Sequence, residues 1–220
     1  MEQPRPKAKR VGIIGGSFDP LHTGHLVIAQ DALEKLELSE LVFVPAAIPP
    51  HKQHIQQADA AHRYAMLQLA TEADLRFSVS DVEIRRGGIS YTIDTVRHLK
   101  AERPEVEWVL IIGSDTLVDL HTWYKIDELL GLCEVATFLR PGESSLEEIG
   151  RKVTLPEANK KKLLGNIIEA HQIGISSTEI RMRVADTPRW ELCGAQGEER
   201  KNPPLSTIPY SVPEACVHAI

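Results

Sequence analysis

The segment GIIGGSFDPLHTGHLVIAQ, from Gly12 to Gln30, is the stretch from which the rest of the chain can be interpreted. It runs from an apolar stretch of strand length through two adjacent glycines into a helical pattern that begins near Thr23 or Gly24. A strand followed by a glycine turn and a helix is typical of the first part of a parallel α/β unit.

The same alternation continues along the chain. Apolar runs of strand length recur at Val11–Ile14, Leu41–Val44, Val79–Ile84, Val109–Ile112, Val135–Leu139 and Asn166–Ile173. Helical spacing lies between most of them, as in Leu26, Ala29, Leu33 and Leu36, or in Ile93, Val96 and Leu99 before the stop signal Pro104. We therefore expect an α/β fold: a Rossmann-like, doubly wound parallel sheet in a single domain, with a small C-terminal helical part.

In such a fold, ligands bind beyond the carboxyl ends of the strands. The segments expected there are GGSFDPLHTGH, PAAIPPHK, RRGGISYT, GSDTLVDLHTW and GISSTEIR. They are rich in Gly, Ser, Thr, His and Lys, which suits a site that handles phosphate.

Composition limits the classes of partner. The chain has 220 residues, enough for one well-packed domain, and a formal charge of −6, which argues against nonspecific binding of nucleic acid. Three scattered cysteines without a CxxC pair favour a reducing compartment, and we expect a cytoplasmic protein with no signal peptide and no membrane span. The segment from Asp186 to Pro204 has no periodicity and many charges and prolines, so we expect an exposed, inserted loop.

The glycine turn can bind phosphate. Gly15 and Gly16 permit close backbone approach, and a helix start beyond them offers free N–H groups and the positive end of a dipole. His22 and His25 are three residues apart, so both can face one side of the helix start and meet a polyphosphate. A glycine turn with two surface histidines, or a pair of metal ligands, would also explain this pattern.

Two separated motifs narrow these readings. GGSFDPLHTGH resembles the GGxFDPxHxGH signature of the nucleotidylyltransferase superfamily, and GISSTEIR, Gly174–Arg181, resembles its second signature, ISSTxIR. The segments PPHK, SYTIDT and IGSDTLVDLHTWYKIDELL are similar to those of the bacterial nicotinate mononucleotide adenylyltransferases. The resemblance covers about Arg10 to Val184.

The resemblance implies adenylyl transfer from ATP to nicotinate mononucleotide, giving deamido-NAD and pyrophosphate, with Mg²⁺ accompanying ATP. The substrate phosphate is already an ionised nucleophile, so catalysis requires positioning and charge stabilisation rather than a side-chain nucleophile and base. The resemblance assigns catalysis to His22, His25 and Arg181, with His25 at the transition-state charge. It assigns ATP binding to these three residues together with Gly15, Gly16, Ser17, Phe18, Gly113, Asp115, Ser176, Ser177 and Thr178.

Several of these residues also have a plain structural explanation. Ser176–Thr178 can be an ordinary helix cap with Arg181 as a solvated charge, and Asp115 can cap the helix that follows its strand. At the mononucleotide end, the resemblance implies Lys52 for the phosphate, Trp123 for stacking on the pyridine, and Tyr91 and Thr92 for its carboxylate. Thr92 could instead cap its helix, and Lys52 could be an exposed loop lysine.

Other functions stay open at this stage. Phosphopantetheine adenylyltransferase and an enzyme that prefers nicotinamide mononucleotide share the phosphate signature. A nucleotide-sensing or binding module that keeps the loop without turnover is a non-enzyme alternative, and a zinc protein using His22 and His25 is a third. The partners expected are ATP and the mononucleotide, without nucleic acid or membrane, in a possible homo-oligomer. Beyond ISSTEIRMRV the chain departs from the family pattern, because Ala215 and Cys216 stand where Tyr and Ile are usual.

Overall fold

The computed structural model describes residues 8–139, 146–171 and 173–186. Its centre is a six-stranded sheet in the order β3-β2-β1-β4-β5-β6, and every neighbouring pair is parallel. The strands are β1 (Arg10–Gly16), β2 (Glu40–Pro45), β3 (Phe77–Val79), β4 (Glu107–Gly113), β5 (Glu134–Leu139) and β6 (Ile167–Glu169). Strand order reverses between β1 and β4, so the doubly wound fold predicted from the sequence is confirmed, and its switch point lies at the glycine turn.

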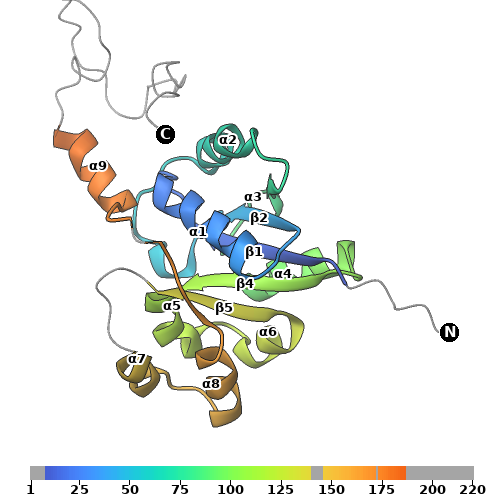
Figure 1. The fold of residues 1–220 in the computed structure, drawn as a ribbon. Helices are drawn as coiled ribbons and strands as arrows, with labels where there is room; N and C mark the ends of the chain where they lie inside the picture. The colour runs from blue at the N-terminus through green and yellow to red at the C-terminus, as the bar shows by residue number, and fades with distance from the viewer. Residues whose placement is uncertain (1–7, 140–145, 172, 187–220) are drawn as a thin grey trace, which may run out of the picture.

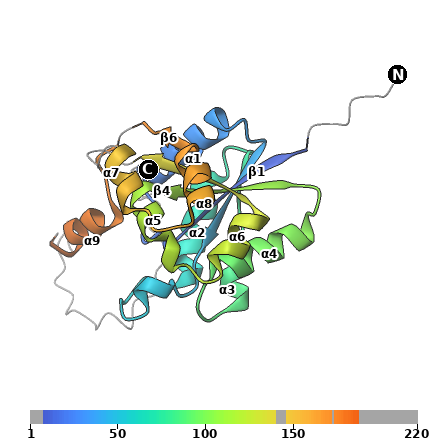
Figure 2. The ribbon, with the colours of Figure 1, turned by 90° about the horizontal axis from the view of Figure 1, so that it is seen from below.

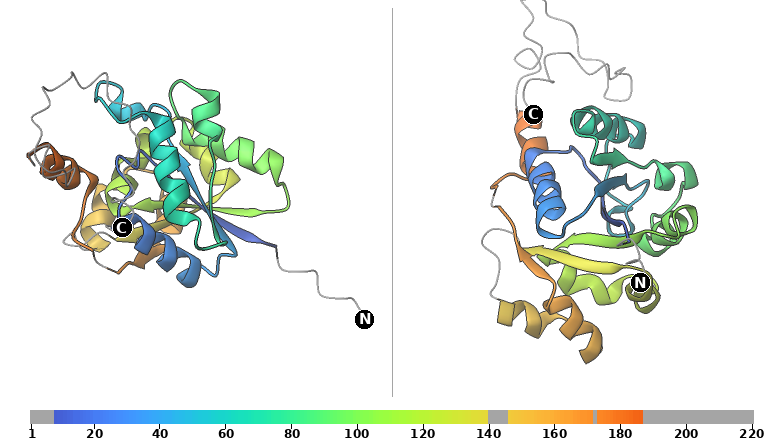
Figure 3. Two further views of the ribbon diagram at one scale, coloured as in Figure 1. Left: turned by 90° about the horizontal axis from the view of Figure 1, so that it is seen from above. Right: turned by 45° about the vertical axis from the view of Figure 1, so that its right-hand side comes forward.

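The helices connect these strands on both faces of the sheet (Figures 1 and 2). They are α1 (Thr23–Lys35), η1 (Pro50–Lys52), α2 (Ala60–Thr71), α3 (Val82–Arg86), α4 (Thr92–Glu102), α5 (Ser114–Asp119), η2 (Leu120–Thr122), α6 (Ile126–Leu132), α7 (Leu146–Lys152), α8 (Glu157–Leu164) and α9 (Ser177–Asp186). Figure 3 shows α1 on one side of the sheet and α4 on the other.

Two apolar layers follow from the alternation of side chains along each strand. Ile13 and Leu110 face a layer that includes residues of α4, α5 and α6, whereas Phe43 and Ile111 face a layer that includes residues of α1 and α2. Because both faces of the central strands are covered, these strands are nearly continuous runs of apolar residues.

Two strand predictions need correction. The apolar run Val79–Ile84 is not one strand, because β3 ends at Val79 and α3 begins at Val82. The Ser80 side chain accepts a hydrogen bond from Val82 N at 3.4 Å, and Asp81 pairs with Arg85 one turn later at 2.8 Å, so two polar residues start a helix inside an apolar run. The predicted strand Asn166–Ile173 is reduced to Ile167–Glu169.

The expected loop from Asp186 to Pro204 and the atypical segment around Ala215 and Cys216 lie outside the described residues, except that Asp186 ends α9. Among the helices that the structure describes, none is long and apolar enough to cross a membrane.

Candidate active site

The loop after β1 joins the first strand to α1 at the switch point of the sheet. Gly15 leaves open space beside the backbone, since an added Cβ would meet no atom within 4 Å. Phe18 has the left-handed backbone conformation (φ 48°), and its side chain is buried at 2% exposure. This loop is therefore anchored by an aromatic ring below and leaves its glycine backbone accessible above.

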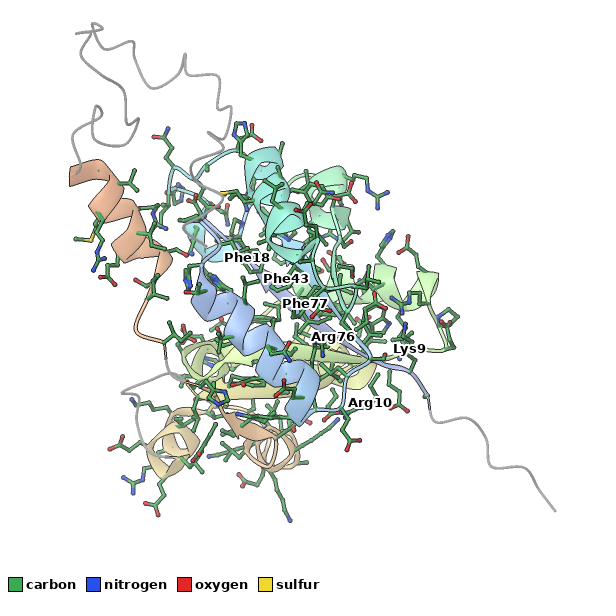
Figure 4. The ribbon with its side chains drawn as sticks, turned by 45° about the horizontal axis from the view of Figure 1, so that its top comes forward. Lys9, Arg10, Phe18, Phe43, Arg76 and Phe77 are labelled. Carbon is green, nitrogen blue, oxygen red and sulfur yellow. The ribbon has the colours of Figure 1, made fainter. Side chains whose placement is uncertain are left out.

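An aromatic row supports the two histidines. The Phe18 ring contacts the Phe43 ring edge to face, with centroids 5.8 Å apart, and Phe43 contacts Phe77 in the same way at 5.8 Å (Figure 4). The edge-to-face contact between Phe18 and His25 has a centroid distance of 5.2 Å. The orientation of His25 is thus fixed by core packing beneath it.

His22 and His25 lie together at the start of α1. Their ring centroids are 3.8 Å apart, and the His22 backbone N–H donates to His25 Nδ1 at 3.3 Å. His22 is the N-cap residue, which places both rings at the positive end of the helix dipole. The expectation that the two histidines face one side is confirmed.

The second motif docks on the first, although the two are more than 150 residues apart. Arg181 donates to the Asp19 carbonyl at 2.5 Å, and the Ser177 hydroxyl donates to the Pro20 carbonyl at 2.8 Å. The segment that leads into α9 also lies against the first turn of α1, since a Cβ added at Gly24 would meet Ile175 Cγ2 at 3.4 Å. Arg181 is exposed, and it is also hydrogen-bonded to the glycine-turn loop.

The serines and threonine of the second motif have different roles. Ser176 accepts a hydrogen bond from Glu179 N at 3.1 Å, so its hydroxyl caps α9, as the plain structural explanation expected. Thr178 accepts from Arg181 at 3.2 Å and is exposed. Ser177 is held on the loop of the first motif, which brings the start of α9 next to the two histidines.

Lys52 lies against the glycine-turn loop. Its Nζ donates to Ser17 Oγ at 3.3 Å from the short helix η1, and Gln57 approaches the same oxygen at 3.5 Å. The loops after β1 and β2 are therefore adjacent, and the lysine is placed between the segments expected to meet ATP and the mononucleotide.

The loop after α3 brings the remaining expected residues to this edge. Gly87 and Gly88 both have φ of 68°, a conformation that glycine adopts at little cost, and they turn the chain back toward Ser90. Tyr91 is the N-cap of α4 and Thr92 is its first helical residue, so the capping position weighed for Thr92 belongs to Tyr91.

Aromatic residues collect beside this helix start. The Tyr91 ring lies 4.8 Å from the Tyr124 ring, and Tyr124 is 51% exposed. Trp123 packs partly buried against the core, and its stacking role stays a prediction. After β4, Gly113 is the N-cap of α5 and the exposed Asp115 lies in the first turn.

Sequence reasoning missed two buried charged residues that support these loops. Arg63 on α2 is 1% exposed, and Glu83 on α3 is 6% exposed. Glu83 accepts from Thr95 Oγ1 at 2.5 Å; burial raises the pKa of this carboxyl, while hydrogen bonds from Thr95 and Ser90 oppose the rise. A signal for Arg63 was present, because it is four residues from Leu67 and eight from Thr71 on the buried face of α2.

A third missed group holds the segment that leads to the second motif. Asp31 on α1 is 2% exposed and accepts from His171 N at 2.7 Å and from His171 Nδ1 at 2.6 Å. Burial alone would raise the pKa of Asp31, but the His171 hydrogen bonds and Lys35 hold it below its ordinary value. Lys35 also donates to the Glu169 carbonyl at 2.6 Å, so α1 fixes the chain before it reaches α9.

A separate cavity of about 580 Å³ lies among α6, α8 and the beginning of β5, lined in part by Cys133, Lys162 and Asn166. Because this is the amino end of β5, the cavity is at the opposite edge of the sheet from the loops described above. The candidate site is instead the loop after β1, because Arg181 and Lys52 both donate to this loop and it leads directly into His22 and His25.

This chain is similar in sequence and in fold to known proteins. The family model described as cytidylyltransferase-like matches residues 13–183. The chain is 41% identical over 175 residues to a "Probable nicotinate-nucleotide adenylyltransferase" of Clostridium botulinum (strain Langeland / NCTC 10281 / Type F), covering 79% of this chain and 86% of the relative. A protein of the same name from Synechococcus sp. (strain JA-3-3Ab) is 40% identical, covering 84% and 87%.

Solved structures show the same fold. The Plasmodium falciparum nicotinic acid mononucleotide adenylyltransferase complexed with NaAD superposes with a TM-score of 0.57 at 20% identity, covering 79% of this chain and 83% of that one. The same enzyme complexed with APC gives a TM-score of 0.57 at 19% identity, with the same coverage.

Proposed function

The chain belongs to the cytidylyltransferase-like family, with nicotinate-nucleotide adenylyltransferases as relatives over most of its length, and from this premise we propose that it transfers the adenylyl group of ATP to nicotinate mononucleotide. The products are deamido-NAD and pyrophosphate, which places the reaction in NAD biosynthesis. The names of the relatives and the family match support this assignment.

One observation on the structure carries the proposal. Arg181 and Ser177 of the second motif bind the carbonyls of Asp19 and Pro20 in the first motif. Two helix starts, two imidazoles and a guanidinium therefore surround one loop whose glycine backbone is accessible. This donor set suits a polyphosphate, because backbone N–H groups at helix starts and cationic side chains both stabilise phosphate oxygens.

The reaction needs no side-chain nucleophile. An oxygen of the mononucleotide phosphate attacks the α-phosphorus of ATP, the bond from this phosphorus to the bridging oxygen breaks, and pyrophosphate leaves with the electron pair. In this scheme His25 and His22 stabilise charge on the α-phosphate, and Arg181 with Ser177 and Thr178 meets the β- and γ-phosphates. Good orientation of two reactants can lower a barrier by about 7–11 kcal/mol.

The mononucleotide end would be formed by the loops after β2 and α3. Lys52 meets the phosphate of the mononucleotide from its position beside Ser17. Thr92 offers a hydroxyl and a helix-start N–H to the nicotinate carboxylate, Tyr91 begins the same helix, and Trp123 provides the stacking face. Gly113 and Asp115 after β4 are assigned to the adenosine ribose.

We further propose that Mg²⁺ accompanies ATP. Among the described residues there is no group of three or more His, Cys, Asp or Glu side chains that could hold a metal ion. Mg²⁺ would therefore be held largely by the phosphates of ATP and by water, which is how this ion commonly binds. Bound there, Mg²⁺ would neutralise charge on the leaving pyrophosphate. A cytoplasmic location and a homo-oligomer are proposed on the sequence alone.

The test is pyrophosphate release with ATP and Mg²⁺, with nicotinate mononucleotide, nicotinamide mononucleotide and phosphopantetheine compared as acceptors. We expect a strong preference for the nicotinate substrate. Preference for either other acceptor would reassign the substrate while retaining adenylyl transfer. Absence of release with all three, in a folded protein that binds ATP, would leave a nucleotide-binding module; stoichiometric zinc in the purified protein would favour the metal reading of His22 and His25.

A further inference from the structure

Arg63 is the largest of the fully buried side chains in the described residues. It points from α2 into the protein on the same helix face as Leu67 and Thr71, where an apolar residue would be expected. Burial of a cation is costly unless hydrogen bonds and charges compensate it. A buried guanidinium at this position must therefore have hydrogen-bond partners that compensate its burial.

The guanidinium joins three segments through their backbone carbonyls. One terminal nitrogen donates to the Ser17 carbonyl at 2.6 Å, and the other donates to Ala46 at 2.8 Å and to Ala47 at 3.4 Å. The Nε donates to the Ala58 carbonyl at 3.0 Å. Because the guanidinium is planar and its donors have fixed directions, these bonds fix the loops relative to one another.

The buried charge is balanced at a distance. Burial lowers the pKa of Arg63, and the charges of Asp19 and Asp59 act in the opposite direction. Asp19 also accepts from Ala58 N at 3.3 Å, so a carboxylate of the first motif fastens the same segment that Arg63 binds. Arginine remains protonated in proteins, so the donors are present at every pH at which the fold exists.

The connection continues to the substrate loop after α3. Ala47 N donates to Ser90 Oγ at 2.9 Å, and Ser90 N donates to the Ile48 carbonyl at 2.9 Å. The other partner of Ser90 is the buried Glu83, whose carboxyl also binds Thr95 of α4. An unbroken series of bonds therefore runs from the phosphate loop at Ser17 to the helix start at Tyr91.

We propose that Arg63 is a positioning residue that sets the separation and orientation of the ATP loop at Ser17 and the mononucleotide loop at Ala46 and Ala47. This inference rests on the proposed function, because these are the loops assigned there to the two substrates. Arg63 touches neither substrate; it acts by holding the loops that do. Its loss would leave each loop able to bind its own substrate while the reacting phosphates lose alignment.

The test compares Arg63→Lys and Arg63→Met with the same two changes at Arg97. Arg97 is the matched control because it lies on the surface of α4, where it pairs with Glu128 at 2.6 Å, outside the site. Lysine keeps the charge at position 63 but has a single donor group, which cannot reproduce the fork. The measurements are kcat and KM for both substrates per folded molecule, the affinity for each substrate alone, and amide hydrogen exchange.

We expect kcat to fall by about a hundredfold in both Arg63 variants, the effect of misplacing reactants by about 1 Å. Both KM values and both separate affinities should change by less than about fivefold, since positioning is lost rather than binding. Amide exchange should accelerate around Ser17 and Ala47 together, but not in β5. The Arg97 variants should match the wild type in all of these quantities.

Wild-type kcat in a folded Arg63→Lys enzyme would overturn the proposal, as would a loss of rate accounted for entirely by the unfolded fraction. If Arg63→Met does not fold, Arg63→Lys decides, because it retains the compensated charge. Failure of the wild-type protein to release pyrophosphate would instead refute the proposed function. In that case hydrogen exchange alone would still test whether Arg63 couples the two loops.

Discussion

Replacing Gly24 by alanine should lower the activity of the protein while leaving its thermal stability nearly unchanged. Gly24 is buried in the first turn of the helix, directly beneath the His22 ring. An added Cβ would lie 3.0 Å from both Cε1 and Nδ1 of that ring and 3.4 Å from Ile175 Cγ2. The ring must therefore shift by several tenths of an ångström, and the segment that carries the second motif is also in contact.

The two effects have opposite signs. Alanine in place of a helical glycine stabilises by about 0.5–1 kcal/mol, which offsets the contact strain and leaves Tm within about 4 °C of wild type. Displacement of a catalytic group by a fraction of an ångström should lower kcat by about 10- to 100-fold, since about 1 Å costs about a hundredfold. That loss corresponds to about 1.4–2.7 kcal/mol of transition-state stabilisation.

The assay is pyrophosphate release under saturating ATP and nicotinate mononucleotide, with thermal unfolding followed on the same samples. Gly131→Ala is the control, because Gly131 lies in α6 and an added Cβ there meets no atom within 4 Å. This control should gain Tm and keep its activity. Wild-type kcat in Gly24→Ala would refute the reasoning, because it would mean that the position of His22 does not matter to the reaction.

Three further predictions concern single side chains. His25→Ala should lower kcat by about 10²- to 10³-fold, as expected for one charge-stabilising donor, with Tm changed by only a few degrees; turnover near wild type would remove His25 from the mechanism. Burial raises the pKa of Glu83, so the stability this carboxyl contributes is present below its ordinary pKa and is lost as pH rises through the folded value. The Tm of Glu83→Gln minus the Tm of wild type should therefore increase as pH rises from about 4 to about 7. A difference in Tm that is independent of pH would contradict this. Burial raises the pKa of Cys133 to about 11, so iodoacetamide should leave this thiol unmodified in the folded protein at neutral pH; rapid alkylation detected by mass spectrometry would show that the site opens.

Local errors in the sequence interpretation have a common origin. The run Val79–Ile84 is apolar because it is buried, and burial alone does not distinguish a strand from a short helix. Ser80 and Asp81 end the strand through side-chain and ion-pair contacts that periodicity does not reveal. Likewise, β6 is shorter than its apolar run because His171 is bound by Asp31 from another element.

The sequence by itself determined the doubly wound fold and the group of residues at the carboxyl edge of the sheet. Apolar runs of strand length that alternate with helical spacing specify parallel α/β units. Parallel strands bring the loops that follow them to one edge of the sheet, so Gly15, His25 and Lys52 could be placed there without coordinates. Only the tertiary structure decided which atoms hold these loops together. Arg63 binds backbone carbonyl groups, and because every residue has one, no sequence pattern indicates which of them it binds. Arg181 binds the carbonyl of Asp19, which is 162 residues away in the chain. Contacts of this kind depend on the distances between elements in the packed fold, which no local pattern in the sequence sets.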